Sequence, residues 1–455
     1  MIRDNGVMKI VLGAAVFVGG VPCAGPPPAD YQRQLKALQP QLEKLNAMLL
    51  PHPDVHGTAI GLTPSSPGPD PVIQPVKLGL VAFVSVTFPG ADAFPGAPPF
   101  RPVVTGGFAG LAENAEDHAA PRERASPIGV STSHANVSNR SGSIGCRLTD
   151  GNRLWLLSNN HAIAALNHGK PGEYVLQPGR SNRGAPRDRV AVLHDFVRLD
   201  VRGDNYVDAA IACTAPECLA TASPMRSYGR PKPAIQPPYP GLEVRKHGRK
   251  TGRTDGVVAY LMDSVKVRLW NDEFCFRKQI GIRSVENGPV FADQGDSGSL
   301  VVSGEPKTEA YSVGLYFAQD PDTGLYLANP MEFVIKQLGY SQMHVDGQMS
   351  EIGQKSQDLC DRALADGCKN LKRRAPDVKL VKLAEERNRR IDRDLERLRS
   401  RPGVLAATCE PCTKTFSVVV SADSVGVRER IKVMSDKYDV RRYLRNPDGQ
   451  LVPLD

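Results

Sequence analysis

The residues best suited to chemistry lie in the segment Phe291-Ala-Asp-Gln-Gly-Asp-Ser-Gly-Ser-Leu-Val-Val302. Ser297 stands there between Gly295-Asp296 and Gly298. A serine hydroxyl is a weak nucleophile unless a base takes its proton and hydrogen-bond donors stabilise the oxyanion that forms. The glycines allow a tight turn in which the N–H groups of Gly295 and Ser297 face one point. The segment therefore predicts a nucleophilic serine, and it requires a base and an orienting acid elsewhere in the chain.

A histidine and an aspartate with suitable surroundings stand earlier in the chain. His161 follows an apolar strand and small polar residues in Leu154-Trp-Leu-Leu-Ser-Asn-Asn-His-Ala-Ile163, so we expect its ring at a strand end. Asp208 precedes a short apolar strand in Tyr206-Val-Asp-Ala-Ala-Ile-Ala212. A lone histidine or a GDSG tetrapeptide often has only a structural role, but their occurrence together in this order favours a catalytic triad.

The order histidine, aspartate, serine is that of the chymotrypsin class and differs from the order in subtilisins and α/β-hydrolases. The sequence resembles the trypsin-like (chymotrypsin-fold) serine peptidases over about residues 126–342, most closely the branch found in bacteria and in the plant narrow-leaf protease. The segments that carry this resemblance are Ser141-Gly-Ser-Ile-Gly-Cys146, Leu157-Ser-Asn-Asn-His161, Leu176-Gln-Pro-Gly179, Val207-Asp-Ala-Ala-Ile211, Val244-Arg-Lys-His-Gly-Arg-Lys-Thr-Gly-Arg-Thr-Asp-Gly-Val-Val258, Gly295-Asp-Ser-Gly-Ser299, Val313-Gly-Leu-Tyr-Phe-Ala318 and Ala328-Asn-Pro330.

The resemblance implies a mainly β fold of two antiparallel six-stranded β-barrels, the chymotrypsin fold, flanked here by small N- and C-terminal α/β modules. It implies that Ser297 attacks the acyl carbon, that His161 transfers the proton, and that Asp208 orients the imidazole. The N–H groups of Gly295 and Ser297 would form the oxyanion hole. Many short strands separated by turn residues agree with closed antiparallel barrels.

Asp296 needs a separate interpretation. In zymogen-activated trypsins the equivalent aspartate pairs with a newly formed N-terminal amine. No Ile-Val-Gly-Gly-type start precedes the first predicted barrel, so we expect Asp296 to pair with a backbone N–H group or a nearby cation. The corresponding hypothesis is an enzyme that is constitutively competent or is switched by other means, such as docking of a flanking domain.

Substrate preference is predicted from the resemblance alone. In this family the residue six positions before the serine lies at the base of the primary specificity pocket, and here that residue is Phe291. The far wall is expected from Tyr316, Phe317 and Gln319. A phenylalanine base and aromatic walls argue against a Lys/Arg preference and favour a small or apolar pocket.

The chain divides into a signal-peptide-like segment (1–25), an N-terminal module with a Pro/Gly-rich linker (26–125), the protease domain (126–342) and a C-terminal segment with a second module (343–455). Leucines at three- and four-residue steps predict a helix over Ala29–Leu50, followed by strands at Gly57–Leu62 and Val76–Val86. The C-terminal segment has a similar order of helix and strands, including a helix predicted near Val425–Tyr438, which suggests an internal duplication. His52, His56 and His118 fall in predicted loops and are interpreted as solvated bystanders.

The nine cysteines leave several interpretations open. Cys409-Glu-Pro-Cys412 has redox or zinc-ligand spacing, and with Cys360 and Cys368 it could form a four-thiolate zinc site. Structural thiols or one local disulfide are the preferred interpretation. We therefore predict no metal and no cofactor.

The net charge of +8 is compatible with a nucleic-acid partner, but no basic stripe interleaved with aromatic residues is present, so a solvated basic surface is preferred. Residues 1–25 have the shape of a signal peptide and are too short for a membrane span. The protein is expected to be exported if this segment is cleaved, and cytoplasmic otherwise. The expected partners are a protein or peptide substrate and further copies of the chain bound through the flanking modules.

Two alternatives to a serine endopeptidase stay open. One is a non-catalytic peptide-binding or scaffold protein on a protease fold, although binding alone does not require His161, Asp208 and Ser297 together. The other is an esterase that uses the same triad. Comparison of peptide and ester turnover would separate the esterase from the peptidase.

Overall fold

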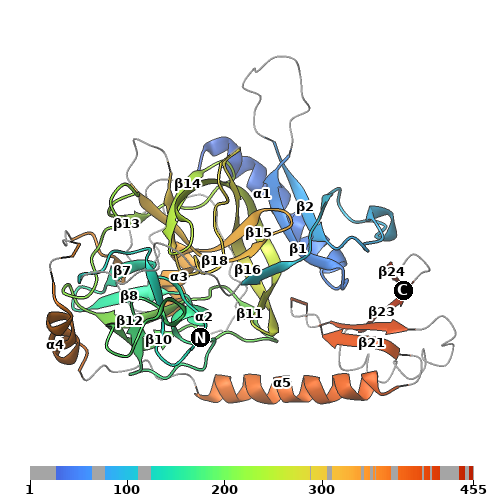
Figure 1. Ribbon diagram of the computed structural model, residues 1–455. Coiled ribbons are helices and arrows are strands. Elements are labelled where there is room, and N and C mark those ends of the chain that lie inside the picture. Colours follow the sequence, from blue (N-terminus) through green and yellow to red (C-terminus); the bar gives the residue numbers. More distant parts are fainter. Residues whose placement is uncertain are drawn as a thin grey trace, which may run out of the picture.

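The computed structural model describes residues 27–63, 77–110, 124–286, 288–304, 310–339, 343–348, 352–353, 355–369, 378–401, 404–409, 412–413, 415–420, 440–445 and 450–453 (Figure 1). The described chain is mainly β-structure, arranged in a 12-stranded, an 8-stranded and a 4-stranded sheet. The predicted signal-peptide segment, His118 and the helix predicted near Val425–Tyr438 lie outside the described residues.

Six strands of the largest sheet close into a ring. Around the ring, in the order β14, β17, β18, β19, β16 and β15, each strand pairs antiparallel with both neighbours, and β15 pairs back with β14. Apolar side chains from these strands, such as Phe276 and Phe317, pack together with ring centroids 4.7 Å apart. The bounds are β14 (Glu243–Gly248), β15 (Gly252–Leu269), β16 (Asp272–Ser284), β17 (Leu300–Ser303), β18 (Tyr311–Asp320) and β19 (Leu325–Pro330).

The 8-stranded sheet lies beside this ring, as the green strands in Figure 1 show, and all its strands except β20 precede the ring in the chain. Its pairings run along one path, β20-β7-β8-β12-β10-β9-β5-β6, and its two end strands have two residues each. The bounds are β5 (Ser131–His134), β6 (Gly142–Ser143), β7 (Cys146–Thr149), β8 (Leu154–Ser158), β9 (Tyr174–Leu176), β10 (Arg189–Phe196), β12 (Ala210–Thr214) and β20 (His344–Val345).

We call the 8-stranded sheet the first body and the closed six-stranded ring the second body. Together they give the chain the chymotrypsin fold that the sequence predicts. The second body is a closed six-stranded ring, whereas the pairings of the first follow an open path among the described residues. Two short helices, α2 (Asn160–Ile163) and η2 (Arg180–Asn182), lie within the segment that forms the first body. Strands β11 (Asp204–Asn205) and β13 (Lys232–Ile235) pair with β16 and β18 of the second body, and α3 (Met331–Leu338) follows β19.

The N-terminal segment continues the sheet of the second body. Helix α1 (Ala29–Leu49) buries a leucine stripe against β1 (Val55–Leu62) and β2 (Leu78–Val84). Strand β1 pairs antiparallel with β15, with Gly57 opposite Val265, and β2 pairs parallel with β3 (Arg101–Val104). The segment also contains η1 (Ala91–Ala93) and β4 (Phe108–Gly110). The blue elements in Figure 1 therefore extend the ring through shared hydrogen bonds.

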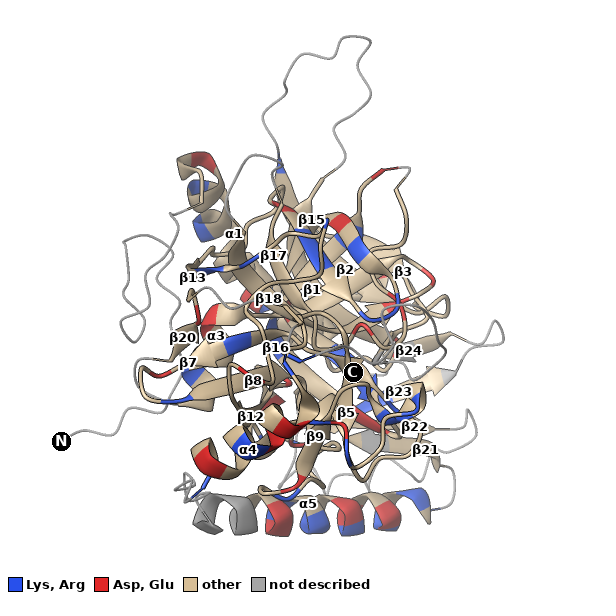
Figure 2. Ribbon diagram, turned by 60° about the vertical axis from the view of Figure 1, so that its left-hand side comes forward, with Lys and Arg blue, Asp and Glu red and all other residues tan. Residues whose placement is uncertain are grey.

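The C-terminal segment begins with α4 (Gln357–Gly367), which packs against β10 and β12 of the 8-stranded sheet. Helix α5 (Val378–Arg399) then runs along the bottom of Figure 1 toward the small C-terminal sheet. Acidic and basic residues alternate along α5 in Figure 2, as expected for a solvated helix. A small sheet follows, formed by β21 (Val404–Cys409), β22 (Phe416–Val420), β23 (Val440–Arg445) and β24 (Leu451–Pro453). Strands β21, β22 and β23 repeat the antiparallel and parallel pairings of β1, β2 and β3, which is compatible with the predicted duplication.

Three disulfides tie this segment to the two bodies. Cys213 of β12 pairs with Cys368, and Cys218 pairs with Cys360 of α4. Cys275 of β16 pairs with Cys412, 137 residues further on. The hypothesis of a four-thiolate zinc site is therefore wrong, because three of its four sulfurs are consumed in disulfides. The preference for structural thiols or one local disulfide was also wrong, since the bonds join distant segments.

The two flanking modules meet at His52. Its Nε2 lies 2.8 Å from the carbonyl oxygen of Leu451, and its ring packs edge-on against Tyr443 at 4.8 Å. The side chain is fully buried, so its interpretation as a solvated bystander is wrong; the turn after α1 is covered by the C-terminal sheet. No described helix is both long and apolar enough to cross a membrane.

Candidate active site

Two paired strands bring His161 and Asp208 together. Strands β8 and β12 are antiparallel, with Ser158 opposite Ala210, so the residues just beyond these positions emerge at one edge of the sheet. The histidine lies on the short helix α2, directly after β8, and Asp208 directly precedes β12. His161 Nδ1 hydrogen bonds to Asp208 Oδ2, and the backbone N–H of His161 donates to Asp208 Oδ1 over 3.1 Å. The carboxylate is fully buried, and it holds His161 through two bonds, one to the ring and one to the backbone.

Three amide side chains hold this aspartate in place. Asn159 Nδ2 donates to the carbonyl oxygen of Asp208 over 2.7 Å, and the backbone N–H of Asp208 donates to Asn329 Oδ1 over 2.9 Å. Asn329 in turn donates to Gln279 Oε1 over 2.6 Å. The first two amides fall within segments that carry the family resemblance, but their roles were not predicted, because their partners come from separate strands.

Ser297 is packed against the histidine segment at two glycines. The backbone N–H of Ser143 donates to the carbonyl oxygen of Ser297 over 2.7 Å. A Cβ atom at Gly142 would lie 2.6 Å from that oxygen and 2.8 Å from Ala162 Cβ, next to His161 in the chain. A Cβ atom at Gly298 would lie 2.2 Å from Ser158 Oγ. Both glycines therefore permit a close approach of the serine turn to the end of β8 and to α2.

The hydroxyl of Ser297 faces a main-chain carbonyl. Its Oγ lies 3.5 Å from the carbonyl oxygen of Phe317, a long and weak hydrogen bond. Among the described residues it has no hydrogen bond to the His161 ring. Catalytic hydrogen bonds of free enzymes are often long and tighten when substrate binds. The structure thus brings the three predicted triad residues to one place but forms only the histidine–aspartate contact.

The turn before Ser297 leaves two N–H groups without a protein acceptor. Within the described part of the chain, neither Gly295 N–H nor Ser297 N–H makes a backbone or side-chain hydrogen bond. The Gly295 carbonyl oxygen instead accepts from Ser143 Oγ over 3.0 Å. Arg249, a buried cation that the sequence did not single out, packs beneath the turn, and its Nε donates to the carbonyl oxygen of Ser141 over 3.2 Å. The bond from Ser143 fixes the peptide plane between Gly295 and Asp296.

Asp296 finds the cation that the sequence predicts. Lys246 Nζ lies 3.0 Å from Asp296 Oδ2, and both side chains are fully buried. Thr251 Oγ1 and the N–H groups of Lys250 and Asp293 also donate to the carboxylate, over 2.7, 2.8 and 3.0 Å. Burial acts to raise the pKa of Asp296, but Lys246 and these hydrogen bonds outweigh it and hold the pKa below its ordinary value. Lys246 lies within the basic run Arg245-Lys-His-Gly-Arg-Lys250, and the sequence could not show which of these cations turns inward.

The four residues predicted to line a specificity pocket are all buried: Phe291, Tyr316, Phe317 and Gln319. Phe291 packs against Tyr326 with ring centroids 5.6 Å apart, and Lys246 Nζ lies 5.7 Å from the Phe291 ring centroid. The Tyr316 hydroxyl donates to Gln319 Oε1 over 2.8 Å. Phe317 faces the other way, toward Phe276 in the ring core. Aromatic side chains thus fill the space below the serine turn.

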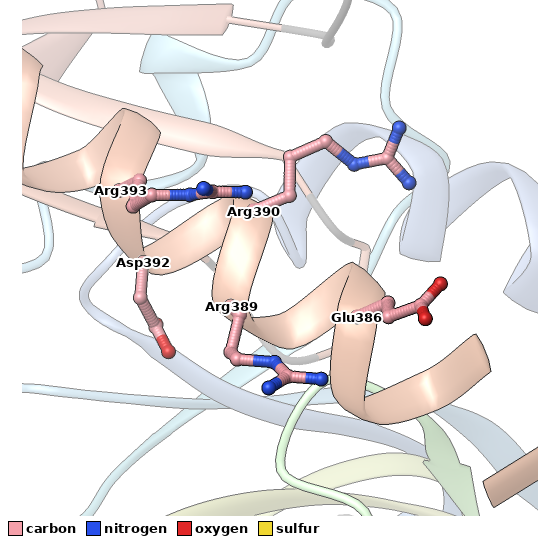
Figure 3. Close-up of a pocket in the computed structure, with 5 residues that line it drawn as sticks. All are labelled: Glu386, Arg389, Arg390, Asp392 and Arg393. Atoms are coloured by element: carbon pink, nitrogen blue, oxygen red, sulfur yellow. The ribbon is translucent and has the colours of Figure 1, made fainter. Parts of the chain in front are cut away.

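Two surface hollows lie outside the triad. One, of about 730 Å³, has five lining residues among those that the structure describes, all of them charged and on α5 (Figure 3): Glu386, Arg389, Arg390, Asp392 and Arg393. The other, of about 580 Å³, lies between the segment after β5 and Trp270 at the tip of the β15–β16 hairpin. Arg140 stacks over the Trp270 ring at 4.4 Å, and this contact joins the hairpin tip to the 8-stranded sheet.

No protein-family model matches the sequence, and no curated protein matches it. Solved structures match about half of the chain. They include a Cellulomonas bogoriensis chymotrypsin (18% identity, 49% of this chain and 98% of that chain, TM-score 0.33) and Thermobifida fusca protease A (15%, 48% and 98%, TM-score 0.33). A third is a glutamic acid-specific serine protease that uses a histidine triad in substrate binding (13%, 48% and 100%, TM-score 0.34).

Proposed function

We propose that the chain is a serine endopeptidase that cleaves peptide bonds through an acyl-enzyme. Ser297 Oγ attacks the substrate carbonyl carbon while His161 Nε2 takes its proton, and the same nitrogen later gives the proton to the leaving amine. Asp208 holds the ring with Nδ1 protonated and stabilises the imidazolium. The observation that carries the proposal is the buried Asp208 carboxylate, which accepts from both the ring and the backbone of His161.

The proposal places the oxyanion of the tetrahedral intermediate at the N–H groups of Gly295 and Ser297. Main-chain donors aimed at a developing negative charge contribute several kcal/mol to lowering the barrier, of the order of 3–4 per donor. Support comes from the absence of protein acceptors for these two groups in the described chain. The buried Lys246–Asp296 pair holds the turn in this conformation without a new N-terminus, so the proposed enzyme needs no zymogen cleavage of the trypsin kind.

The filled space below the serine turn supports a preference for small side chains before the scissile bond. Phe291, Tyr316 and Tyr326 occupy the region that the family resemblance assigns to a substrate side chain. The residue at this position is Phe291, and it has no carboxylate that could attract a lysine or arginine side chain of the substrate. We therefore propose alanine- or glycine-sized residues there, and we place the chain with the bacterial-type branch named above.

Oxidising surroundings fit the three disulfides, because such bonds persist mainly in exported proteins. Export is accordingly part of the proposal.

Turnover of peptides and esters by purified protein tests the function. We expect hydrolysis of alanine-containing p-nitroanilides that is abolished by Ser297→Ala and lowered about 10⁴-fold in kcat by Asp208→Asn, because the asparagine leaves the wrong histidine tautomer. Turnover of esters without turnover of any peptide amide would favour the esterase. No turnover of either class would favour the binding protein.

A further inference from the structure

Strand β4 occupies an unusual place between two strands of the second body. Ala109 lies opposite Gln319 of β18 in antiparallel register, and opposite Arg268 of β15 in parallel register. The N-terminal module thus inserts Phe108–Gly110 into a gap between β18 and the long β15–β16 hairpin. The six-stranded ring is closed without β4, so the pairings of β4 with β18 and β15 are additional to those that close the ring.

The same edge of β18 is where a peptide must lie if its carbonyl group is to reach Ser297. The Phe317 carbonyl oxygen is 3.5 Å from Ser297 Oγ, so β18 passes directly beside the nucleophile and then runs away from it toward Gln319. The other edge of this stretch is taken by β19, with Ala318 opposite Leu327. An extended peptide that adds to the remaining edge, as peptides often add to sheets, meets β4 at Gln319.

The direction of β4 matches that of such a peptide. Because β4 is antiparallel to β18 and β18 leaves the serine in the direction of Gln319, the path from Phe108 to Gly110 leads toward Ser297. The main-chain groups of Gln319 cannot pair with β4 and with a substrate strand at once, since each strand edge holds one neighbour. Strand β4 and a substrate strand therefore cannot occupy this edge at the same time.

The N-terminal module holds β4 firmly in this position. Phe108 is 3% exposed and packs edge-on against Phe83 of β2 at 5.6 Å between ring centroids. Just before β4, the Thr105 hydroxyl bonds to Asp320 Oδ2 at the end of β18, and the Thr105 backbone N–H donates to Val84 over 2.8 Å. The Thr105–Asp320 bond thus ties the module to the end of β18, next to Gln319.

We propose that β4 is a built-in competitor for extended peptide substrates, which must displace it from Gln319 before their scissile bond can reach Ser297. This inference rests on the proposed function. It predicts different behaviour for two classes of reagent. Small compounds that react with Ser297 do not pair with β18, so β4 does not slow their reaction. Peptides of several residues must pair with β18, so β4 slows their reaction. The N-terminal module is then a regulator that acts in cis through its own main chain.

Two substitutions in full-length protein test this competition. Ala109→Pro removes a main-chain N–H from a strand that has neighbours on both sides, where proline is not tolerated. Phe108→Ala removes the anchor on Phe83. The substrates are tetrapeptide p-nitroanilides that differ in their last residue. For the best of these substrates, each substitution should raise kcat/KM at least 10-fold. Neither should change kcat/KM for an N-acetylalanine p-nitrophenyl ester or the labelling rate with a fluorophosphonate. Val104→Ala, at a 58% exposed position of the same module, is the matched control and should change none of these values.

Hydrogen exchange of the unaltered protein gives a second test that does not depend on the variants folding. A tetrapeptidyl chloromethyl ketone attached at the active site should raise the exchange rate of the amides of β4, and a small fluorophosphonate should not. Unchanged β4 exchange with the peptidyl reagent, or unchanged peptide turnover in folded variants, would overturn the inference alone. Failure of the unaltered protein both to label and to turn over esters would overturn the proposed function, and the inference with it.

Discussion

Lys246 Nζ lies 3.0 Å from Asp296 Oδ2, fully buried beneath the turn that carries Ser297. The ammonium group comes from β14 of the same body, and the carboxylate belongs to the residue that directly precedes the serine. A buried charge that keeps its partner is tolerated, and one that loses it is strongly destabilising. The pair therefore fixes the conformation of the turn, and it makes Lys246 a positioning residue for Ser297.

Removal of the lysine should be costly. Lys246→Met leaves Asp296 buried without its cation, and we expect the free energy of unfolding to fall by about 3–5 kcal/mol. Urea unfolding measures this change, and fluorophosphonate labelling should slow in parallel because the turn loosens. Arg253→Ala is the matched control, because Arg253 and Asp255 form an exposed pair worth less than about 1 kcal/mol. Equal losses in both variants would show that the buried pair has no special role.

Acid should destabilise the protein through the same carboxylate. The pKa of Asp296 is held below its ordinary value of 3.8, so the folded state binds fewer protons than the unfolded state near this pH. The resulting stability is fully present above 3.8 and is lost as the pH falls through the lowered folded pKa. Urea midpoints measured from about pH 6 down to pH 2 should show this loss. In Asp296→Asn the midpoint should change less over the same range, and an unchanged slope in this variant would contradict the prediction.

The disulfide between Cys275 and Cys412 should contribute strongly to stability. Its two cysteines are 137 residues apart in the sequence. For a loop of this length the chain-entropy account gives a stabilisation of about 5 kcal/mol. The double substitution Cys275→Ala and Cys412→Ala should lower the free energy of unfolding by about this amount in guanidinium titrations. Cys409→Ala provides the comparison, because Cys409 is a buried cysteine outside the three disulfides and the substitution removes only a small group. A double variant as stable as Cys409→Ala would show that the bond does not constrain the unfolded chain.

Removal of the Phe291 ring should open space for larger substrate side chains. Phe291→Ala deletes a fully buried ring at the base of the aromatic cluster, at a cost in stability of about 3–5 kcal/mol. We expect the ratio of kcat/KM for leucine over alanine p-nitroanilides to rise at least 10-fold. Phe317→Leu is the control, since Phe317 packs toward Phe276 and away from the cluster. A ratio that stays constant in Phe291→Ala would place the specificity pocket elsewhere.

Local patterns were sufficient to predict the regular elements. The leucine steps of α1 and the apolar stretch of β8 appear within a few residues of their expected bounds, because each depends on a pattern within one segment. The pairing of His161 with Asp208 also followed, since both stand at strand ends in a known order.

Relationships between distant segments could not be predicted. The pairing of β1 with β15 joins residues about two hundred positions apart, and nothing in either strand specifies the other. Disulfide connectivity cannot be deduced from spacing, so the three bonds to the C-terminal segment were missed. The place of β4 beside Gln319 was missed for the same reason, because a three-residue strand carries almost no local signal.

The most direct test of the account is the site and extent of labelling by a fluorophosphonate, which reacts with activated serines. Purified full-length protein should take up one label per chain, and peptide mass mapping should place it on Ser297. His161→Ala should slow this reaction at least 100-fold, since general-base catalysis contributes about 10²–10⁴-fold. Ser297→Ala should take up no label. Labelling at another residue, or labelling that is unaffected by the loss of His161, would contradict the catalytic role assigned to Ser297.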